Sequence, residues 1–584
     1  MTSTALTGLT SRSGRARDPL PPLMLVLTIA TSVVIIACLL TVFWISFIKG
    51  DPDAAHSYTL SNYPAVVTDA RTWQVLWNTL GFAVSSLLVS FLFGLPAAWL
   101  VERTDLPGKP VVFTLMTIGL LMPGFAAAMG WLFLLNTRIG LVNVWLMQTF
   151  GLHEAPFNIS SIFGMGWVQG LNLAPLSFIM TAAVFRAMDP ALEESARVSG
   201  ASSGAVHGRV TLPLAWPGIL AAGIYIFTIG FAAFDVPAII GWGNRIFTFA
   251  TFLYLLTNPQ DTLPKYGSAA ALSGVLVILA GAMSWWYARM QQRARRYSVV
   301  TGKAYRPRMG ALGRRVWLAW GFLGTYFALA KLVPVLTVIW SSLLPYFMLP
   351  GKQAFAQATL QQYRALPWPL AFDGLTNTAI LMALTPTVTL VLCVCFSWVV
   401  LRSRVPGRAL FDFVAFLPHA VPNIVFGVGV ILITLYVLQT VVPIYSTIWI
   451  LLFVFVIARL SYGTRMTNSG LIQIHTELEE SAQISGASTA GTFRSVVLPL
   501  LSPTLIYAWL WIALLTFREL TLAVILTTPH NMTLPVVIWS LWLGGGFAQA
   551  SALVVVTLLL MIPLVVLYWL IAGRIGLLSA RGDT

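Results

Sequence analysis

The chain has 584 residues, of which 58% are hydrophobic and only 9% are charged, and its mean hydropathy is +0.83. A soluble domain carries roughly a quarter charged residues, so the composition excludes an ordinary soluble protein and indicates a membrane protein. The formal net charge of +15 would also suit a nucleic-acid-binding protein. The distribution of the basic residues along the chain indicates the orientation of membrane spans instead. No nucleic-acid partner is predicted.

Long apolar runs follow one another along the whole chain. Each is longer than the ~20 residues that a helix needs to cross the hydrocarbon core, and none resembles the ~10-residue alternating strands of an outer-membrane barrel. We therefore predict an all-α membrane protein with about twelve transmembrane helices in a lipid bilayer. The predicted spans are residues 22–48, 75–101, 111–136, 161–185, 216–241, 267–289, 316–343, 375–401, 413–438, 444–464, 501–527 and 551–573.

The basic residues predict the orientation of these spans. Nine Lys and Arg lie between residues 289 and 315, and three more precede the first span. Basic residues favour the cytoplasmic side of a membrane. We therefore expect the tails 1–21 and 574–584 and the basic linker 290–315 to be cytoplasmic. The opposite side would carry only Lys49, Arg71, Arg138, Arg245, Lys265, Lys352 and Arg364.

One segment occurs twice. Residues 192–203 read LEESARVSGASS and residues 478–489 read LEESAQISGAST, a separation of 286. Upstream, Arg103 matches Arg402 at a separation of 299, so the second half lacks 13 residues (299 − 286) between these markers. We place the difference in the outer loop that follows the third span, where the first half carries residues 137–160.

The repeat divides the chain into two domains of six spans, at residues 22–289 and 316–573. Both halves begin on the same side of the membrane, so the repeats are parallel and related by an axis along the membrane normal. A transport path between such repeats lies at their interface, near the middle of the membrane.

Each copy of the segment lies in a polar loop, at residues 187–214 and 465–500. In the first loop Pro190 is a favourable first helical residue, and Glu193 and Glu194 occupy the first turn, where the helix dipole favours anions. Gly200 can end the helix. Each loop therefore predicts a short helix lying across the ends of two spans, before Leu212-Pro213 or its equivalent opens the next span.

These loops resemble the Glu-Ala-Ala motif of ABC importer permeases. Ser195 and Ser481 depart from the second-position Ala of that motif, and Val210 and Val496 replace Ile. The resemblance implies the type I ABC importer fold and a coupling helix that docks on an ATPase subunit. It assigns this contact to Glu193, Glu194, Ala196, Gly200, Leu212, Pro213, Glu479, Glu480, Ala482, Gly486, Leu498 and Pro499.

The resemblance also implies partners. The sequence contains no Gly-x4-Gly-Lys-Ser/Thr phosphate loop, so this chain is predicted to be no enzyme and to bind no cofactor, with ATP-Mg held in partner ATPase subunits. Two motifs in one chain predict two ATPase subunits. A periplasmic solute-binding protein would deliver the solute, and the location would be the bacterial inner membrane.

The region after each loop points to a solute. Asp235, the group Arg518-Glu519-Leu520 and the stretch LPHAVP at 417–422 resemble ferric-iron importer permeases, so ferric iron is the predicted substrate. Thiamine, aminoalkylphosphonate, polyamine or another small solute stays open. A twelve-span secondary transporter is a remote alternative that would not need the doubled motif. A membrane enzyme is disfavoured because no catalytic constellation is evident.

Asp235, Arg518 and Glu519 are ionisable residues that fall inside predicted spans. Such groups are costly in the membrane and usually face a cavity or a partner. We predict that they belong to the translocation pathway, with a structural ion pair as the alternative. Neighbouring helix positions differ by about 100°, so of Arg518 and Glu519 one should line the pathway and the other should pair with another span. His153, His419 and His530 lack metal-ligand spacing, and no metal site is predicted.

Overall fold

The computed structural model describes residues 18–49, 57–120, 122–188, 190–259, 263–295, 310–439 and 441–581. Apart from one pair of two-residue strands, the regular structure in these ranges is helical. The linker 290–315 and the N-terminal tail lie largely outside them. The elements of the first half are α1 Leu20–Ser46, β1 Ile48–Lys49, β2 Ser57–Tyr58, α2 Asn62–Thr68, α3 Ala70–Arg103, α4 Lys109–Gly119, α5 Gly124–Leu135, α6 Leu141–Phe150, α7 Ile162–Arg186, α8 Pro190–Val198, α9 Ser203–Val206, η1 His207–Thr211, α10 Leu212–Ala232, η2 Pro237–Gly241, η3 Trp242–Asn244, α11 Phe249–Thr257 and α12 Tyr266–Arg295.

The second half repeats this order. Its elements are η4 Gly313–Arg315, α13 Val316–Phe327, η5 Ala328–Leu332, α14 Val333–Ser342, α15 Lys352–Gln357, α16 Gln361–Arg364, α17 Trp368–Leu401, α18 Arg408–Ala420, α19 Asn423–Tyr436, α20 Ile448–Gln473, α21 Thr476–Ile484, α22 Thr489–Thr492, η6 Phe493–Val497, α23 Leu498–Phe517, α24 Thr521–Leu526, α25 Leu534–Leu543 and α26 Phe547–Arg581.

The helix starts follow the two separations read from the sequence. Helices α4 and α18 begin at residues 109 and 408, which is 299 apart, and α7 and α20 begin at 162 and 448, which is 286 apart. The change falls between the third and fourth spans, where the first half carries the additional helix α6. The predicted position of the length difference is therefore confirmed.

The twelve predicted spans correspond to helices of the structure. Ten helices within the described ranges are long and apolar enough to cross a membrane, and the third span of each half is a bent pair. The bend is 92° between α4 and α5 and 102° between α18 and α19. A further bent pair, 237–257, was not predicted as a span of its own. The all-α fold of two six-helix repeats is confirmed.

Two predicted spans extend too far. The span predicted at 216–241 ends as a helix at Ala232, and the one predicted at 501–527 ends at Phe517. In the first half Pro237 follows closely, and proline has no backbone N–H with which to continue a helix. Arg518 and Glu519 therefore lie in a break between helices, and Asp235 directly follows the break at Ala233 and Phe234.

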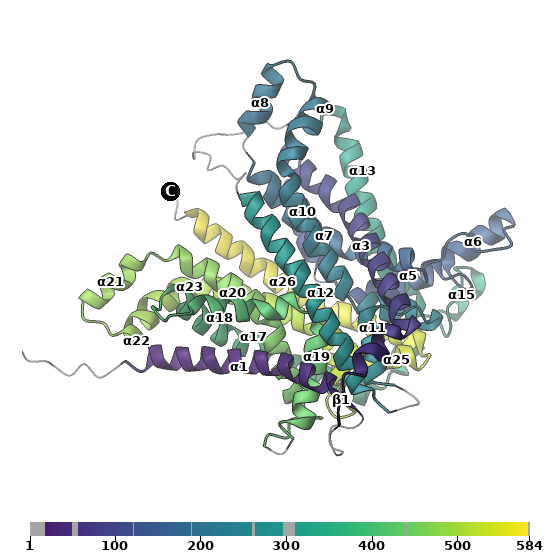
Figure 1. Cartoon of the computed structure of the whole chain (residues 1–584). Coiled ribbons are helices and arrows are strands. Elements are labelled where there is room, and N and C mark those ends of the chain that lie inside the picture. Colours follow the sequence, from purple (N-terminus) through teal and green to yellow (C-terminus); the bar gives the residue numbers. More distant parts are fainter. Residues whose placement is uncertain are drawn as a thin grey trace, which may run out of the picture.

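The first helix of each half packs against the other half. Helix α1 contacts α17, α18 and α19, and α14 contacts α5. Figure 1 shows α1 lying along the arm formed by α17 and α18. The contiguous domains 22–289 and 316–573 therefore do not correspond to two separately packed bodies. Each half contributes its first span to the other.

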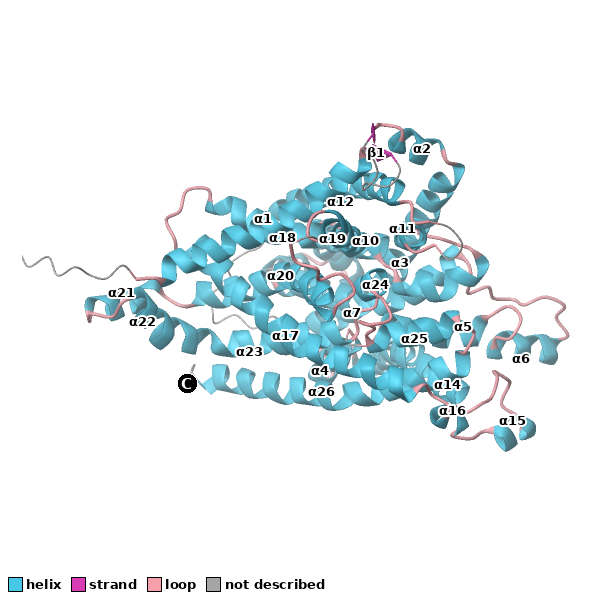
Figure 2. Ribbon diagram, turned by 90° about the horizontal axis from the view of Figure 1, so that it is seen from below, coloured by secondary structure: helices cyan, strands magenta, loops and turns pink. Residues whose placement is uncertain are grey.

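The molecule has two diverging arms, which end at α8 in the first half and at α21 in the second (Figure 1). Helices α6 and α15 project from the end opposite α21 (Figures 1 and 2). The arms meet around α19, α24, α5 and α25, where buried residues of both halves form one continuous core. The central cavity described below lies at this junction.

Candidate coupling helices and central cavity

The two repeated loops fold alike. Helices α8 and α21, hereafter the coupling helices, begin at Pro190 and Thr476 and are each followed by a glycine with positive φ, Gly200 at 86° and Gly486 at 95°. Glycine adopts this left-handed conformation without the penalty that a Cβ brings. Both loops then re-enter the body through a π-helix, η1 or η6, so the two halves present the same local structure.

An arginine holds the coupling helix of the second half. Nε of Arg402, at the end of α17, donates to Oε1 of Glu479 at 2.7 Å. Its Nη2 donates to the carbonyl oxygens of Leu471 and Ile474 at 3.0 and 2.7 Å. These carbonyls lie at the end of α20, so one guanidinium joins α17, α20 and α21.

The equivalent arginine of the first half makes the same connection with a looser geometry. Arg103 lies 3.8 Å from Oε1 of Glu193, which also accepts a hydrogen bond from Oγ1 of Thr211 at 2.9 Å. Its Nη2 donates to the carbonyl of Met188 at 3.4 Å. Glu193 is only 6% exposed. The first glutamate of each motif thus faces the chain's own arginine, although the sequence analysis grouped it with the ATPase contacts.

The opposite side of each coupling helix is exposed. Val198 is 90% exposed and its equivalent Ile484 is 87% exposed. Glu480 is exposed, whereas Glu194 is half-buried. The remaining predicted coupling residues lie at the helix ends or at the start of α10 and α23, where Leu212 and Leu498 are 45% and 38% exposed. The two arms therefore expose apolar side chains at equivalent positions.

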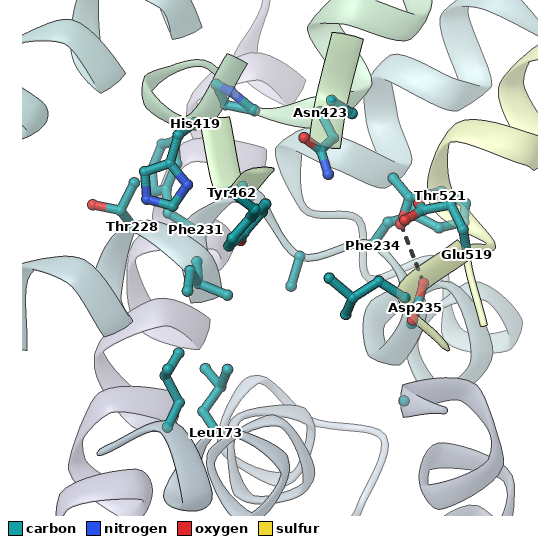
Figure 3. A pocket seen from close by; sticks show the side chains of 18 of the residues that line it. Leu173, Thr228, Phe231, Phe234, Asp235, His419, Asn423, Tyr462, Glu519 and Thr521 are labelled. Carbon is teal, nitrogen blue, oxygen red and sulfur yellow. Dashed lines mark hydrogen bonds between the residues drawn. The ribbon is translucent and has the colours of Figure 1, made fainter. Parts of the chain in front are cut away.

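A cavity of about 350 Å³ lies between the halves. Its walls come from the breaks between α4 and α5 and between α18 and α19, from α7 and α20, and from the segments that follow α10 and α23. Figure 3 shows Asp235, Glu519 and Thr521 on one side and His419 and Thr228 on the other. The three ionisable residues predicted for the pathway, Asp235, Arg518 and Glu519, all line this cavity.

Asp235 lies where the two halves meet. Its Oδ1 accepts a hydrogen bond from Oγ1 of Thr521 at 3.2 Å. A Cβ placed on Gly124 would lie 3.1 Å from its Oδ2, so the carboxylate lies directly against the first residue of α5. The negative charge is thus at the positive end of that helix dipole, which is a favourable position for an anion.

Arg518 and Glu519 also connect different parts of the fold. Nη1 of Arg518 donates to the carbonyl oxygens of Leu120 and Met122, at 2.6 and 3.2 Å, in the broken third span of the first half. Glu519 accepts a hydrogen bond from the guanidinium of Arg459 on α20. Both residues line the cavity and both have partners, so the expected division between one lining and one pairing residue was wrong. It assumed a continuous helix, and the helix has already ended at Phe517.

Several cavity residues were not among the sequence candidates. Arg459 lies within the predicted span 444–464, so its charge was itself a signal. Gln169 and Asn172 are three residues apart on α7, which places them on one face of the helix, and both line the cavity. Uncharged amides within a span gave no comparable signal.

The histidine of the cavity lies among aromatic rings. The ring of His419 is stacked on Tyr225 at 5.0 Å and lies 5.5 Å from Tyr462. Within the described residues no group of three or more His, Cys, Asp or Glu side chains is placed to hold a metal ion. The charged groups of the cavity form hydrogen bonds and an ion pair within the protein.

Aromatic side chains from both halves pack beside Asp235. Phe234 and Trp242 of the first half each lie near Trp539 of the second, with ring centroids 6.2 and 5.9 Å apart. Tyr254 contacts both first-half rings, at 5.7 and 5.8 Å. We call these four residues the aromatic cluster. It joins the segments that follow α10 and α23 across the interface.

Comparison with known proteins shows which family this chain resembles. The model of the family described as binding-protein-dependent transport system inner membrane component matches residues 393–576, which include the second coupling helix and half of the cavity wall. A putative ferric transport system permease protein of Haemophilus influenzae is 26% identical over 80% of this chain and 72% of its own length. Residues 393–576 thus match this family, and the likeness to ferric transport permeases extends over both halves. The chain is an inner-membrane permease of an ABC importer.

Other relatives of this permease extend over one or both halves. A ferric transport system permease protein of Actinobacillus pleuropneumoniae is 24% identical over 86% of this chain and 71% of its own length. A putative 2-aminoethylphosphonate transport system permease protein of Salmonella paratyphi A is 28% identical over 40% of this chain and 91% of its own length. Permeases of this family work with ATPase and solute-binding partners.

Proposed function

We propose that this chain supplies both permease domains of a ferric-iron importer and that it engages two ATPase subunits, one on each coupling helix. The observation that carries the proposal is the presence of two equivalent coupling helices on one chain. Each is fixed by an arginine and each exposes an apolar residue at the same position. The N- and C-terminal tails would then be cytoplasmic, together with both coupling helices.

The contacts with the ATPases would be made by the exposed sides of the coupling helices. Val198 and Ile484 are the most exposed apolar residues there, and Glu194 and Glu480 follow the arginine-bound glutamates in each motif. Glu193 and Glu479 would not reach the ATPase. They would instead transmit its movement, because each links its coupling helix to α3 or α17 through Arg103 or Arg402.

We infer the transport cycle from the separation of the two arms that carry the coupling helices. With the arms apart, the cavity would be accessible from the cytoplasm, and the aromatic cluster with the Asp235–Thr521 bond would close the opposite side. Closure of the two ATPases on ATP would draw the coupling helices together and separate these contacts. ATP shifts this equilibrium only through different affinities for the two states.

Ferric iron is supported by the relatives that match most of the chain. The phosphonate permease of Salmonella matches one half at slightly higher identity, so 2-aminoethylphosphonate is the second candidate. Both solutes would reach the cavity from a periplasmic binding protein with one lobe over each half.

The test is uptake by the complete complex. This chain would be reconstituted in liposomes with its ATPase and its binding protein, and uptake of ⁵⁵Fe and of labelled 2-aminoethylphosphonate would be measured with ATP inside. We expect iron uptake that requires the binding protein. Uptake of the phosphonate alone would keep the import function and exclude iron.

The coupling assignment has its own variants. Val198→Asp with Ile484→Asp places a charge on each docking surface and should abolish co-purification of the ATPase. Glu194→Ala with Glu480→Ala should reduce solute-stimulated ATP hydrolysis. The matched control is Ser199→Asp with Ser485→Asp, at the next residue of each loop, which is exposed and polar. Equal co-purification of all three would exclude these surfaces as the docking sites.

A further inference from the structure

The two broken spans present helix N-termini to the cavity, but these N-termini differ in what lies beside them. Helices α5 and α19 start at the equivalent residues Gly124 and Asn423, after prolines that give no side-chain cap. The first backbone N–H groups of a helix lack partners within the helix. Both residues line the cavity. The two sites are therefore alike in backbone structure.

The start of α5 already has an anion beside it. The carboxylate of Asp235 lies against Gly124. The residue equivalent to Asp235 in the second half is Thr521, 286 positions further on, and it is uncharged and donates its hydroxyl hydrogen to Asp235. The second half thus has the helix N-terminus without the carboxylate. Asn423, which stands there, makes no side-chain hydrogen bond within the described part of the chain.

Other hydrogen-bond donors of the cavity also lack partners. Arg459 is 6% exposed, and its Nε has no hydrogen-bond partner although its Nη2 binds Glu519. Gln169 is 8% exposed and forms no hydrogen bond with the described residues. Both amide atoms of Asn172 are buried and without partners. A buried polar group without a partner carries a desolvation cost that a ligand can remove.

The two carboxylates of the cavity, in contrast, already accept hydrogen bonds within the protein. Asp235 accepts from Thr521, and Glu519 accepts from Arg459 and from the backbone N–H of Leu522 at 3.2 Å. A bare cation would have to compete with these bonds, whereas an anion would meet free donors. The free hydrogen-bonding capacity of the walls therefore favours oxygen atoms that carry negative charge.

We infer that the start of α19 binds an oxyanion group of the transported solute, in the place that Asp235 fills at α5. Gln169, Asn172 and Arg459 line the same cavity as Asn423 and supply further hydrogen-bond donors. The inference rests on the proposed import function and adds the chemistry of the solute. Iron would cross as a chelate with carboxylate or phosphate groups, and a phosphonate would bind through its own oxygens.

The most direct test is the variant Asn423→Asp. It places a carboxylate at the start of α19, where the oxyanion group of the solute would otherwise bind. We expect it to lower uptake at least about tenfold, through repulsion of like charges. Asn423→Gly, the residue of the first half, should retain more uptake than Asn423→Asp. Asn468→Asp is the control, because this half-buried amide lies on α20 outside the cavity and should leave uptake unchanged.

The complete complex in liposomes would be supplied with ⁵⁵Fe as its citrate and, separately, its pyrophosphate complex, with the chelator labelled by ¹⁴C or ³²P. We expect the chelator to enter together with iron in a fixed ratio. Iron that enters without either chelator, or Asn423→Asp that transports like wild type, would overturn the inference. If Asn423→Asp does not assemble, the pair Gln169→Leu and Asn172→Leu replaces it, and an unchanged half-saturating concentration would contradict the inference.

The iron assignment can fail separately. If wild type takes up labelled 2-aminoethylphosphonate but no iron, and Asn423→Asp blocks that uptake, iron is excluded and the oxyanion site stands. If the complex hydrolyses ATP but takes up neither solute, both the proposed function and the oxyanion site are contradicted.

Discussion

Asp235 and Thr521 occupy equivalent positions in the two halves, 286 residues apart, and they are hydrogen-bonded to each other at 3.2 Å. Two equivalent residues touch only where the axis that relates the halves passes between them. This bond therefore marks the axis, beside the cavity. Contacts at such a point report directly on whether the halves move apart.

A disulfide between these two positions should stop transport. Asp235→Cys with Thr521→Cys places two thiols where hydrogen-bonded side chains now meet, and movement of the halves would be blocked once they are linked. Cys38, Cys393 and Cys395 are all buried in the fold, which limits competing links. We expect uptake to fall to background under oxidation and to return with reductant.

The control for this experiment is Asp235→Ser with Thr521→Ser, which cannot form the link. Oxidant-sensitive transport in that pair would show that another site is responsible. Normal transport by the oxidised, cross-linked cysteine pair would contradict separation of the halves at this point.

The Arg459–Glu519 pair should show the energetics of a buried ion pair. Its side chains are 7% and 10% exposed. Removing one partner of such a pair costs about 3–5 kcal/mol, whereas replacing both with apolar residues of similar volume is often nearly neutral. The melting temperature in detergent should therefore be much lower for Arg459→Leu than for Arg459→Leu combined with Glu519→Leu. Additive losses in the double variant would mean that the two side chains do not act as a pair.

The arginines at the coupling helices should be unequal. Arg402 binds Glu479 at 2.7 Å and two carbonyls, while Arg103 lies 3.8 Å from Glu193. Arg402→Ala should therefore reduce solute-stimulated ATP hydrolysis more than Arg103→Ala.

The matched control for these variants is Arg465→Ala. Arg465 forms a surface pair with Asp412, with side chains 51% and 36% exposed, and such pairs contribute only about 0–1 kcal/mol. We expect its ATP hydrolysis to remain close to wild type. A larger effect of Arg465→Ala than of Arg402→Ala would contradict the assigned link.

A side chain at either glycine that follows a coupling helix should destabilise the protein. Gly200 and Gly486 have φ of 86° and 95°, and a left-handed conformation costs an L-residue about 1–2 kcal/mol. Gly200→Ala and Gly486→Ala should each lower the melting temperature of the complex. Gly204→Ala should not, because Gly204 lacks positive φ and has open space around it. Equal effects at all three sites would contradict the conformational explanation.

The N-terminal span should be tied to the second coupling region in a pH-dependent way. Oδ2 of Asp18 accepts from the backbone N–H of Ala490 at 2.6 Å. This bond and a second from Leu20 lower the pKa of Asp18 below its ordinary value of 3.8. Because the folded pKa is lowered, the stabilisation is present above the ordinary pKa and is lost as pH falls through the lowered pKa.

Asp18→Asn should accordingly lower the melting temperature at neutral pH, and its difference from wild type should vanish in acid. Asp69→Asn is a suitable control, since Asp69 caps α3 locally through the N–H of Arg71. A difference for Asp18→Asn that persists unchanged below the lowered pKa would exclude the proposed contact.

The sequence by itself determined the number and order of the spans, the doubled loop and the position of the length difference. These follow from local properties, since apolar length specifies a span and a repeated motif specifies equivalent positions. The sequence also identified Asp235, Arg518 and Glu519, because charge inside an apolar run is visible without any structure.

Only the tertiary structure decided how these parts meet. Hydropathy counted the residues after Ala232 and Phe517 as helix, and only the fold shows the breaks that bring Arg518 to the carbonyls of the first half. The exchange of α1 and α14 between the halves, and the facing of Glu193 and Glu479 toward arginines, likewise depend on contacts between residues far apart in sequence. Apolar surface drives burial without direction, so it specifies which segments enter the membrane but not which neighbours they find there.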